Sequence, residues 1–443
     1  MKYTREYLDK NMNYGDVKNL LSSLGFAPGN RGKEELINII IDYQEGKIEP
    51  KKSKRGRPRK TSVEYPSDEF KNDIVSSGED EVLDYSGQTL KVTGTFEKVS
   101  EDFGFLRGES LRPSPYSDVY VSKPVIREYK LKQGDYIEGV AVCKRLESAP
   151  SLKSVTKING LESFNEERKS FENLTPDYPR EKFELLGDLS VIDLFSPLGK
   201  GQRALIVAEP KAGKTTMLKK IAENVLKDSS VNKVILLLIG ERPEEVTDLK
   251  QSLNAEIIYS TFDEDAERHV KIAEIALDKA KRIAENGGNA VILVDSLTRL
   301  TRAYNELSVS SGKTMSGGID YGALSNAKKF FGSARNLLEG GSLTIIATCL
   351  VNTGSKMDDV IYEEFKGTGN SEIVLKRSLC ERRIFPPVDV ILSGTRKEEL
   401  LLDEKTLASV YKIRRTLDQN QMIKVLERSS SAVNAKDLLD KIN

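Results

Sequence analysis

Residues 208–216 constrain this chain more than any other stretch, because they read AEPKAGKTT between two apolar segments. The preceding run, residues 204–207, is short enough for a buried parallel strand, and apolar residues recur at helical spacing over 217–221. Strand, tight loop and helix in this order form the context of a phosphate-binding loop, in which backbone N–H groups and the helix N-terminus attract phosphate. The usual pattern opens with glycine, and Ala208 is small enough for a similar turn.

Two side chains of this loop have a direct chemical use. Lys214 would reach the β- and γ-phosphates of a nucleotide, and the Thr215 hydroxyl would hold Mg²⁺. The sequence therefore predicts a nucleotide site. The loop residues that we assign to it are Ala212, Gly213, Lys214, Thr215 and Thr216.

The chain around the loop alternates between short apolar runs and helical patterns. Such alternation predicts a mostly parallel sheet with helices on both faces, here over residues 185–443. The candidate buried strands are residues 204–207, 234–239, 257–259, 291–294 and 343–347.

Two carboxylates follow the predicted strands. Asp295 ends the apolar run 291–294, and an Asp in that position of a phosphate-loop enzyme holds the magnesium shell. Glu241 follows the run 236–239 and one glycine, at the mouth of a strand that we expect to be adjacent to the phosphate loop. A carboxylate there could orient the attacking water and accept its proton, which is worth about 10²–10⁴-fold in rate. Glu244 and Glu245 fit a helix N-terminus better.

Residues 86–162 change to a strand-like pattern broken by glycines. About five short strands in this length predict a small Greek-key barrel of the OB type. Phe103 and Phe105 are two positions apart and so share one face of a strand, and Tyr120 lies on another strand, with Arg107 close in sequence. An aromatic face edged by cations stacks the bases of single-stranded nucleic acid. The alternative is that both phenylalanines point into the barrel core.

The N-terminal part divides in two. Residues 1–49 carry two apolar helical patterns and predict a small helical module, whereas residues 50–85 predict a disordered linker that is first basic and then acidic. The segment from Arg55 to Pro58 (RGRP) resembles an AT-hook, an arm that lies in the DNA minor groove. The alternative, which we favour, is a basic linker with non-specific phosphate affinity. Residues 163–184 are polar and predict a connector between the barrel and the α/β unit.

Overall composition excludes several classes of protein. Lys and Arg number 68, as do Asp and Glu, so nucleic-acid binding must come from local patches rather than from net charge. Cys143, Cys349 and Cys380 match neither a zinc spacing nor a disulfide framework, which fits a reducing compartment. The chain has no long apolar segment at its start and no run of about 18 apolar residues anywhere. We therefore expect a soluble, cytoplasmic protein that does not enter a membrane.

Several longer motifs resemble one family, the bacterial transcription termination factor Rho, over about residues 86–425. The family comprises ring-shaped hexameric RNA-dependent ATPases and helicases. The motifs that carry the resemblance are residues 241–246 (ERPEEV), 261–264 (TFDE), 295–299 (DSLTR), 353–357 (TGSKM), 362–370 (YEEFKGTGN) and 393–399 (SGTRKEE).

The resemblance implies roles for individual residues around a bound ATP. Lys211 and Lys214 would contact phosphates, Glu241 would activate water, and Asp295 would serve the Mg²⁺ site. Three further residues would complete the nucleotide site: Arg242 and Arg299 as polar partners and Phe385 against the adenine. Arg396 would be an arginine finger that enters the neighbouring subunit's site.

The resemblance also implies how RNA is bound and what it is bound for. Phe103, Phe105, Arg107 and Tyr120 would form a primary site that prefers pyrimidines, especially cytosine. Two loops would line the central pore: residues 308–320, which carry Lys313, and residues 353–357, which carry Lys356. The expected partners are single-stranded RNA, the RNA polymerase elongation complex and five further copies of the chain.

One position departs from the family pattern, because Gly240 stands where the family commonly has Asp before the catalytic Glu. This departure bears on any water-relay role at that position. His269, on a predicted helix, is interpreted as structural. Two rival classes are a rotary ATP synthase catalytic subunit and a non-enzymatic RNA-binding or nucleoid protein. An aromatic barrel face argues against the first, and the intact loop with Glu241, Asp295 and Arg396 argues against the second.

Overall fold

The computed structural model divides the chain into two units, residues 1–72 and 73–443. In the first unit, helix α3 (Lys33–Gln44) buries Leu36, Ile37 and Ile40, as the second apolar pattern of the N-terminal module predicts. The linker at 50–85, with its Arg55–Pro58 segment, lies outside the described residues. The residues that the structure describes are 17, 32–44, 89–114, 117–143, 149–162, 168–308 and 314–442.

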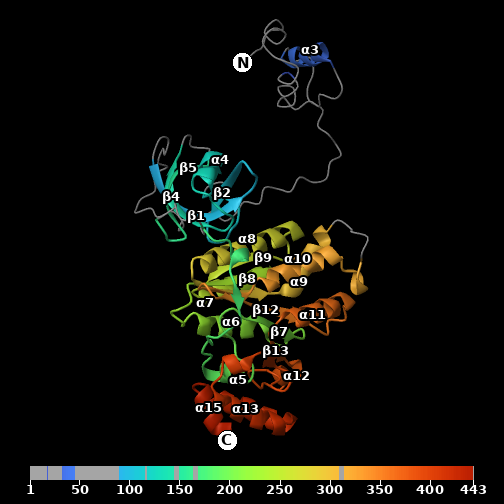
Figure 1. Cartoon of the computed structure of the whole chain (residues 1–443). Helices are drawn as coiled ribbons and strands as arrows, with labels where there is room; N and C mark the ends of the chain where they lie inside the picture. The colour runs from blue at the N-terminus through green and yellow to red at the C-terminus, as the bar shows by residue number, and fades with distance from the viewer. Residues whose placement is uncertain are drawn as a thin grey trace. The chain divides into compact units, whose positions relative to one another are not determined.

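The second unit begins with a closed five-stranded barrel, which confirms the predicted OB-type fold (Figure 1). Its strand order is β1-β2-β3-β5-β4, and its core includes Phe96, Leu106 and Val121. Gly104 leaves space for that core, since a Cβ there would lie 2.5 Å from a ring carbon of Phe96. The barrel elements are β1 (Thr89–Lys98), β2 (Phe103–Arg107), β3 (Val119–Ser122), α4 (Lys123–Glu128), β4 (Tyr136–Val142) and β5 (Ser151–Ile158).

The rest of the unit is built on a nine-stranded sheet whose main path is β14-β13-β7-β12-β10-β8-β9. Strands β13, β7, β12, β10, β8 and β9 run parallel, and β14 is antiparallel at the edge. All five strands expected from the sequence are present. The strands are β6 (Pro176–Asp177), β7 (Arg203–Ala208), β8 (Lys233–Glu241), β9 (Glu256–Thr261), β10 (Asn289–Asp295), β11 (Arg335–Leu337), β12 (Ser342–Leu350), β13 (Ser371–Leu375) and β14 (Gly394–Thr395).

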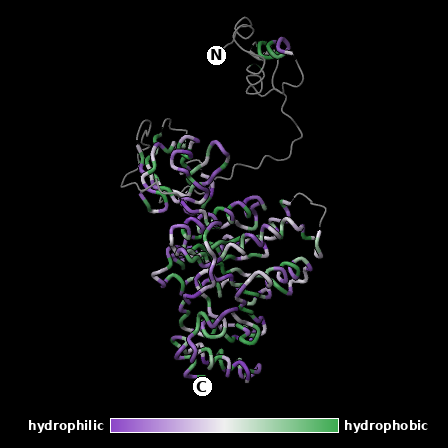
Figure 2. The backbone as a smooth tube through the Cα atoms, in the orientation of Figure 1, coloured by the Kyte–Doolittle hydropathy of each residue, from purple (hydrophilic) through white to green (hydrophobic). Residues whose placement is uncertain are grey.

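Helices cover both faces of this sheet. Alternate residues of each buried strand point to opposite sides, so both faces are apolar and both must be covered. On β7, for example, Ile206 belongs to one core and Val207 to the other. The tube in Figure 2 is accordingly hydrophobic along the central strands. One face carries α5 (Ser190–Phe195), α6 (Lys214–Val225), α7 (Pro243–Ser252), α12 (Arg377–Glu381), α13 (Glu404–Thr416), α14 (Gln419–Ser429) and α15 (Ala435–Ile442). The other carries α8 (Ala266–Glu285), α9 (Leu297–Leu307), α10 (Tyr321–Gly332) and α11 (Lys356–Thr368).

The segment expected to connect the barrel with the sheet takes part in the sheet's own structure. Strand β6 pairs with β11, and the side chain of Phe171, in the short helix η1 (Phe171–Asn173), is fully buried. The remaining short helices are η2 (Gly187–Leu189), η3 (Ser316–Gly318) and η4 (Glu398–Leu400). Within the described part of the chain, no helix is both long and apolar enough to cross a membrane.

Candidate functional site

The loop between β7 and α6 has the backbone of an anion-binding turn. Gly213 adopts φ 81°, which favours glycine, and Lys211 is also left-handed at φ 68°. Helix α6 begins at Lys214 without a side-chain cap on its amino end, as the described residues show. Its first N–H groups therefore remain available, together with the positive end of the helix dipole, for an anion above the loop.

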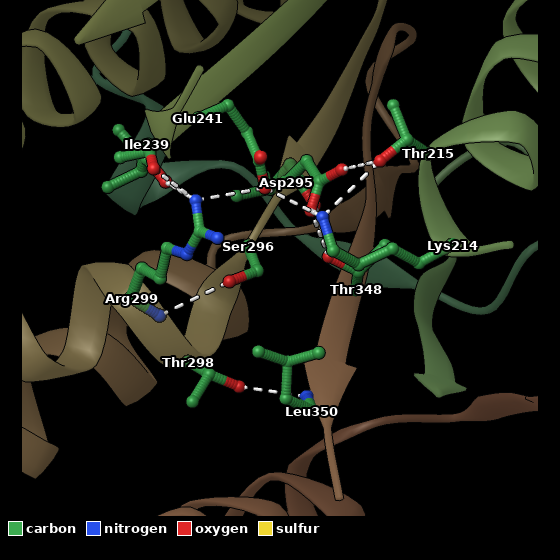
Figure 3. A network of polar contacts seen from close by, with 12 residues as sticks. Lys214, Thr215, Ile239, Glu241, Asp295, Ser296, Thr298, Arg299, Thr348 and Leu350 are labelled. Atoms are coloured by element: carbon green, nitrogen blue, oxygen red, sulfur yellow. Dashed lines mark hydrogen bonds and ion pairs between the residues drawn. The ribbon is translucent and has the colours of Figure 1, made fainter. Parts of the chain in front are cut away.

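Lys214 bridges the two carboxylates that end strands β8 and β10 (Figure 3). Its Nζ lies 2.6 Å from Glu241 Oε1 and 2.7 Å from Asp295 Oδ1. Arg299 Nη1 approaches the same Glu241 oxygen at 3.0 Å. Glu241 and Asp295 are buried, so both carboxylates depend on these cations for compensation.

The network shifts the pKa values of its members in useful directions. Burial raises the pKa of Glu241 above its ordinary value, and repulsion from Asp295 adds to this, against the pull of Lys214. Burial alone would lower the pKa of Lys214, but Asp295 and Glu241 together raise it. Lys214 therefore stays charged at neutral pH, and Glu241 has the raised basicity that a general base requires.

Glu241 lies beside the phosphate loop, as expected, although its strand β8 is not a neighbour of β7 in the sheet. Strands β12 and β10 separate β8 from β7. Glu241 still reaches the loop because β8 carries a register irregularity between Ile239 and Glu241, where Gly240 has φ 66°. Arg299 donates hydrogen bonds to the carbonyl oxygens of Ile239 and Gly240 and so fixes this bulge.

Gly240 faces the same arginine. A Cβ added at Gly240 would lie 3.2 Å from Arg299 Cδ and 3.9 Å from Nε2 of His269. The other ring nitrogen of His269, Nδ1, is hydrogen-bonded to Ser260 Oγ at 2.7 Å. In this chain Arg299 is therefore held by backbone carbonyl oxygens. A side chain at residue 240 would contact Arg299 directly.

Asp295 and Thr215 could share a metal ion. Thr215 Oγ1 donates to Asp295 Oδ2 at 2.9 Å, and Thr348 Oγ1 donates to Asp295 Oδ1 at 2.9 Å. Among the described residues no group of three His, Cys, Asp or Glu side chains could hold a metal by itself. One carboxylate, one hydroxyl and phosphate oxygens with water are the incomplete protein shell that Mg²⁺ accepts.

Most of the other expected nucleotide contacts are exposed. Lys211, Thr216, Arg242 and Phe385 are exposed, and Ala212 is buried beneath the loop. The segment that leads to Phe385 approaches the loop, since a Cβ on Gly213 would lie 3.7 Å from Cys380 Sγ.

Arg396 lies at the other end of the sheet. It follows β14, in which Thr395 pairs with Ser371, and Ser371 pairs with Ala204 near the start of β7. The phosphate loop follows the opposite end of β7, after Ala208. Arg396 is exposed there and is held through its backbone N–H, which donates to Asn370 O at 2.8 Å.

The two expected pore loops are in contact. A Cβ on Gly317 would lie 2.9 Å from the carbonyl oxygen of Lys356. Lys356 is the first residue of α11 and is exposed. Arg302 of α9 forms a bidentate pair with buried Asp358, with Nη2–O distances of 2.7 and 2.8 Å. Lys313 lies outside the described residues.

The barrel phenylalanines are on its outer surface, which excludes the alternative that they form the core. Phe103 stacks on Tyr120 with ring centroids 5.9 Å apart, and Phe105 meets both rings edge-on, at 6.0 Å from Phe103 and 5.9 Å from Tyr120. All three side chains are partly exposed. They form an aromatic cluster of the kind on which bases stack.

Arg107 borders this cluster, but its side chain is buried rather than exposed. Its guanidinium lies 4.8 Å from the ring centroid of Phe105 and is paired with Glu97 and Asp118. Sequence reasoning missed both acids, because Glu97 and Asp118 are 10 and 11 positions away from Arg107. It also missed Thr348 and the Arg302–Asp358 pair, which only the folded chain brings together.

Two family descriptions match this chain in the same order as its two folded parts. Residues 92–163 match the Rho termination factor RNA-binding domain, and residues 188–395 match the nucleotide-binding domain of the ATP synthase alpha/beta family. Transcription termination factor Rho of Cereibacter sphaeroides is 50% identical over 337 residues, which cover 73% of this chain and 80% of that protein. The chain belongs to the Rho family of transcription termination factors.

Other relatives and solved structures agree with this assignment. Transcription termination factor Rho of Thermotoga maritima is 48% identical and covers 79% of this chain and 85% of its own length. A prototypical ATPase from the type III secretion system of pathogenic bacteria has a TM-score of 0.53 at 24% identity, over 67% of this chain and 94% of its own. That likeness supports the fold of the ATPase core. The Rho-family chain is thus an ATP-hydrolysing enzyme that joins a P-loop ATPase core to an RNA-binding barrel.

Proposed function

We propose that this chain is an RNA-dependent ATPase that moves 5′-to-3′ along single-stranded, pyrimidine-rich nascent RNA as a hexamer in the cytoplasm, and releases transcripts from RNA polymerase elongation complexes. The observation that carries the proposal is the placement of Arg396 and the phosphate loop at opposite ends of one sheet. A single copy then supplies the phosphate loop to one reaction site and Arg396 to another. Only assembly of several copies completes each site.

In the proposed reaction, ATP lies over the loop formed by residues 211–216. Lys214 exchanges part of its interaction with Glu241 and Asp295 for the β- and γ-phosphates, and this frees Glu241 to act on water. Thr215 and Asp295 would hold Mg²⁺, which supplies charge neutralisation at the phosphates. Arg299 keeps Glu241 in place, and Phe385 would pack on the adenine.

Glu241 then orients a water molecule and accepts its proton as the water attacks the γ-phosphate. The proton passes to Glu241, whose pKa is raised by burial and by repulsion from Asp295. Arg396 of the neighbouring copy would stabilise the developing charge, an effect worth about 10³–10⁵ in rate. Arg242, exposed at the start of α7, would contact the nucleotide from the side of β8.

Movement along RNA would follow from helix α9, which touches both regions. Its amino end begins after Asp295 and Ser296 and carries Arg299, and its later turns carry Arg302, which binds Asp358 beside Lys356. A shift of α9 on hydrolysis would therefore displace the loop that carries Lys356. Lys313 would contact the same RNA strand. The barrel aromatics Phe103, Phe105 and Tyr120, with Arg107, would capture the RNA beforehand.

The test is ATP turnover by the full chain with and without poly-cytidine RNA. We expect low turnover alone and a strong increase with RNA. Equal turnover in both conditions would reject the proposal.

A second test addresses the trans arrangement. Lys214→Ala and Arg396→Ala chains should each be inactive, and a mixture of the two should recover part of the turnover, because some interfaces then combine intact halves. A mixture that stays inactive, although it assembles, would contradict the trans role of Arg396.

A further inference from the structure

A cavity of about 520 Å³ lies between the outer face of the barrel and helix α8 of the ATPase core. Barrel residues Thr95, Arg107 and Tyr136 line one side, and Asn232, Lys279 and Asn286 of the core line the other. This volume falls in the range of small-molecule sites and exceeds what ordered water alone requires. Among the residues that line the cavity, only Arg107 has a role assigned above.

The cavity continues the aromatic face of the barrel. Thr95 pairs with Arg107 on one side and with Tyr136 on the other, so these side chains share the outer surface with Phe105. From the residue and strand spacings, Tyr136 lies roughly 12 Å from Phe105, two strands away and past Arg107. A nucleic-acid strand that leaves the aromatic cluster over Arg107 would therefore meet the cavity next.

The cations that line the cavity are already paired with carboxylates. Lys279 Nζ lies 2.6 Å from Glu256 Oε1, and Lys233 Nζ lies 2.8 Å from Glu256 Oε2. Arg107 is paired with Glu97 and Asp118. A phosphate placed inside would have to break these pairs, so an uncharged group is the better occupant.

Neutral recognition groups remain available. Tyr136 is 38% exposed, and its ring centroid lies 5.6 Å from Lys279 Nζ on one side, which leaves the other face for stacking. Within the described structure, the Tyr136 hydroxyl, the Asn286 side-chain amide and Asn232 Nδ2 make no hydrogen bond to protein. Amides that offer both a donor and an acceptor match the edge of a nucleobase.

We propose that this cavity binds an uncharged nucleobase, stacked on Tyr136 and read by Asn286. The base comes either from a later nucleotide of the RNA held at Phe105 or from a free nucleoside. The first source rests on the proposed RNA function, and the second does not. In either case the ligand contacts barrel and core together, and so ties occupancy of the RNA site to helix α8.

The test measures binding of cytidine dinucleotide, cytidine hexanucleotide and free cytidine to the full chain by calorimetry. For the RNA source, Tyr136→Ala should weaken hexanucleotide binding about tenfold, as expected for one lost stacking partner, and leave the dinucleotide unchanged. Asn286→Ala, on the core side, should weaken the same ligand, whereas Tyr136→Phe should keep most of the affinity. Tyr178→Ala, at an exposed tyrosine 55% accessible, is the matched control and should change nothing.

The outcomes separate the sources and the failures. Loss of free cytidine binding in Tyr136→Ala, with the hexanucleotide unaffected, would support a nucleoside site. Unchanged binding of all three ligands in Tyr136→Ala, or equal weakening of dinucleotide and hexanucleotide, would overturn the proposal. Phe105→Ala serves as the separate check on RNA capture: if it changes neither oligonucleotide, the proposed function itself fails at the barrel.

Discussion

Replacement of Glu241 by Gln tests the chemistry of the nucleotide site most directly. Glu241 and Gln have nearly the same shape, so the contacts to Lys214 and Arg299, at 2.6 and 3.0 Å, can be retained as hydrogen bonds. The change removes one negative charge from a network that balances Lys214 and Arg299 against Glu241 and Asp295. The network becomes net positive, and ATP should bind at least as tightly as before.

Turnover should nevertheless collapse. General-base catalysis contributes about 10²–10⁴-fold, which corresponds to about 2.7–5.4 kcal/mol of transition-state stabilisation. The assay is steady-state ATP hydrolysis with saturating poly-cytidine, together with direct binding of a fluorescent ATP analogue. Glu244→Gln, at an exposed carboxylate in the first turn of α7, is the matched control and should keep turnover.

The pH dependence supplies an independent readout. Because burial, with Asp295 nearby, raises the pKa of Glu241, activity should rise with pH through a value above the ordinary 4.5 as the carboxylate loses its proton. This acid limb should vanish in Glu241→Gln. A variant that keeps its turnover within about threefold and retains the acid limb would show that another group accepts the proton.

The remaining predictions concern other parts of the chain. Phe105→Ala should weaken RNA binding by about 1–3 kcal/mol and leave the peak ATPase rate nearly unchanged, as measured by RNA titration of turnover. Arg396→Ala should abolish turnover with ATP binding retained; loss of binding instead would remove Arg396 from the finger role. Arg302→Ala should leave ATP binding intact but uncouple turnover from RNA, because it breaks the pair with Asp358; undiminished RNA stimulation would argue against this route. Burial raises the pKa of Asp278 to about 6 from an ordinary 3.8, so this carboxyl favours folding when protonated and that contribution is lost as pH rises through about 6. Asp278→Asn should therefore raise the melting temperature at pH 8 more than at pH 5, and an equal shift at both would refute the cause.

The sequence predicted the features that depend on local pattern. Apolar runs such as residues 291–294 became buried strands because a parallel sheet covered on both faces needs continuous apolar segments. The alternation around Phe103 and Phe105 correctly put them on one face. Local pattern did not say whether that face points outward or into the barrel. The core made by Phe96 and Leu106 decided that it points outward.

Features that depend on distant pairing could not be predicted in this way. The order of parallel strands is not encoded in any one strand, so the sequence did not show that strands β12 and β10 separate β8, which carries Glu241, from β7. The partners of Arg107 were missed for the same reason. Arg107 was expected at the surface as a cation for RNA, whereas Glu97 and Asp118 hold it in a buried position beside Phe105.

The separation of Arg396 from its own phosphate loop has a consequence for populations of mixed chains. Under the proposed arrangement, each copy supplies a pocket to one neighbour and a guanidinium to another. One copy with both parts damaged would silence two reaction centres in a ring, so a mixed population would lose a larger share of its activity than the fraction of doubly damaged copies.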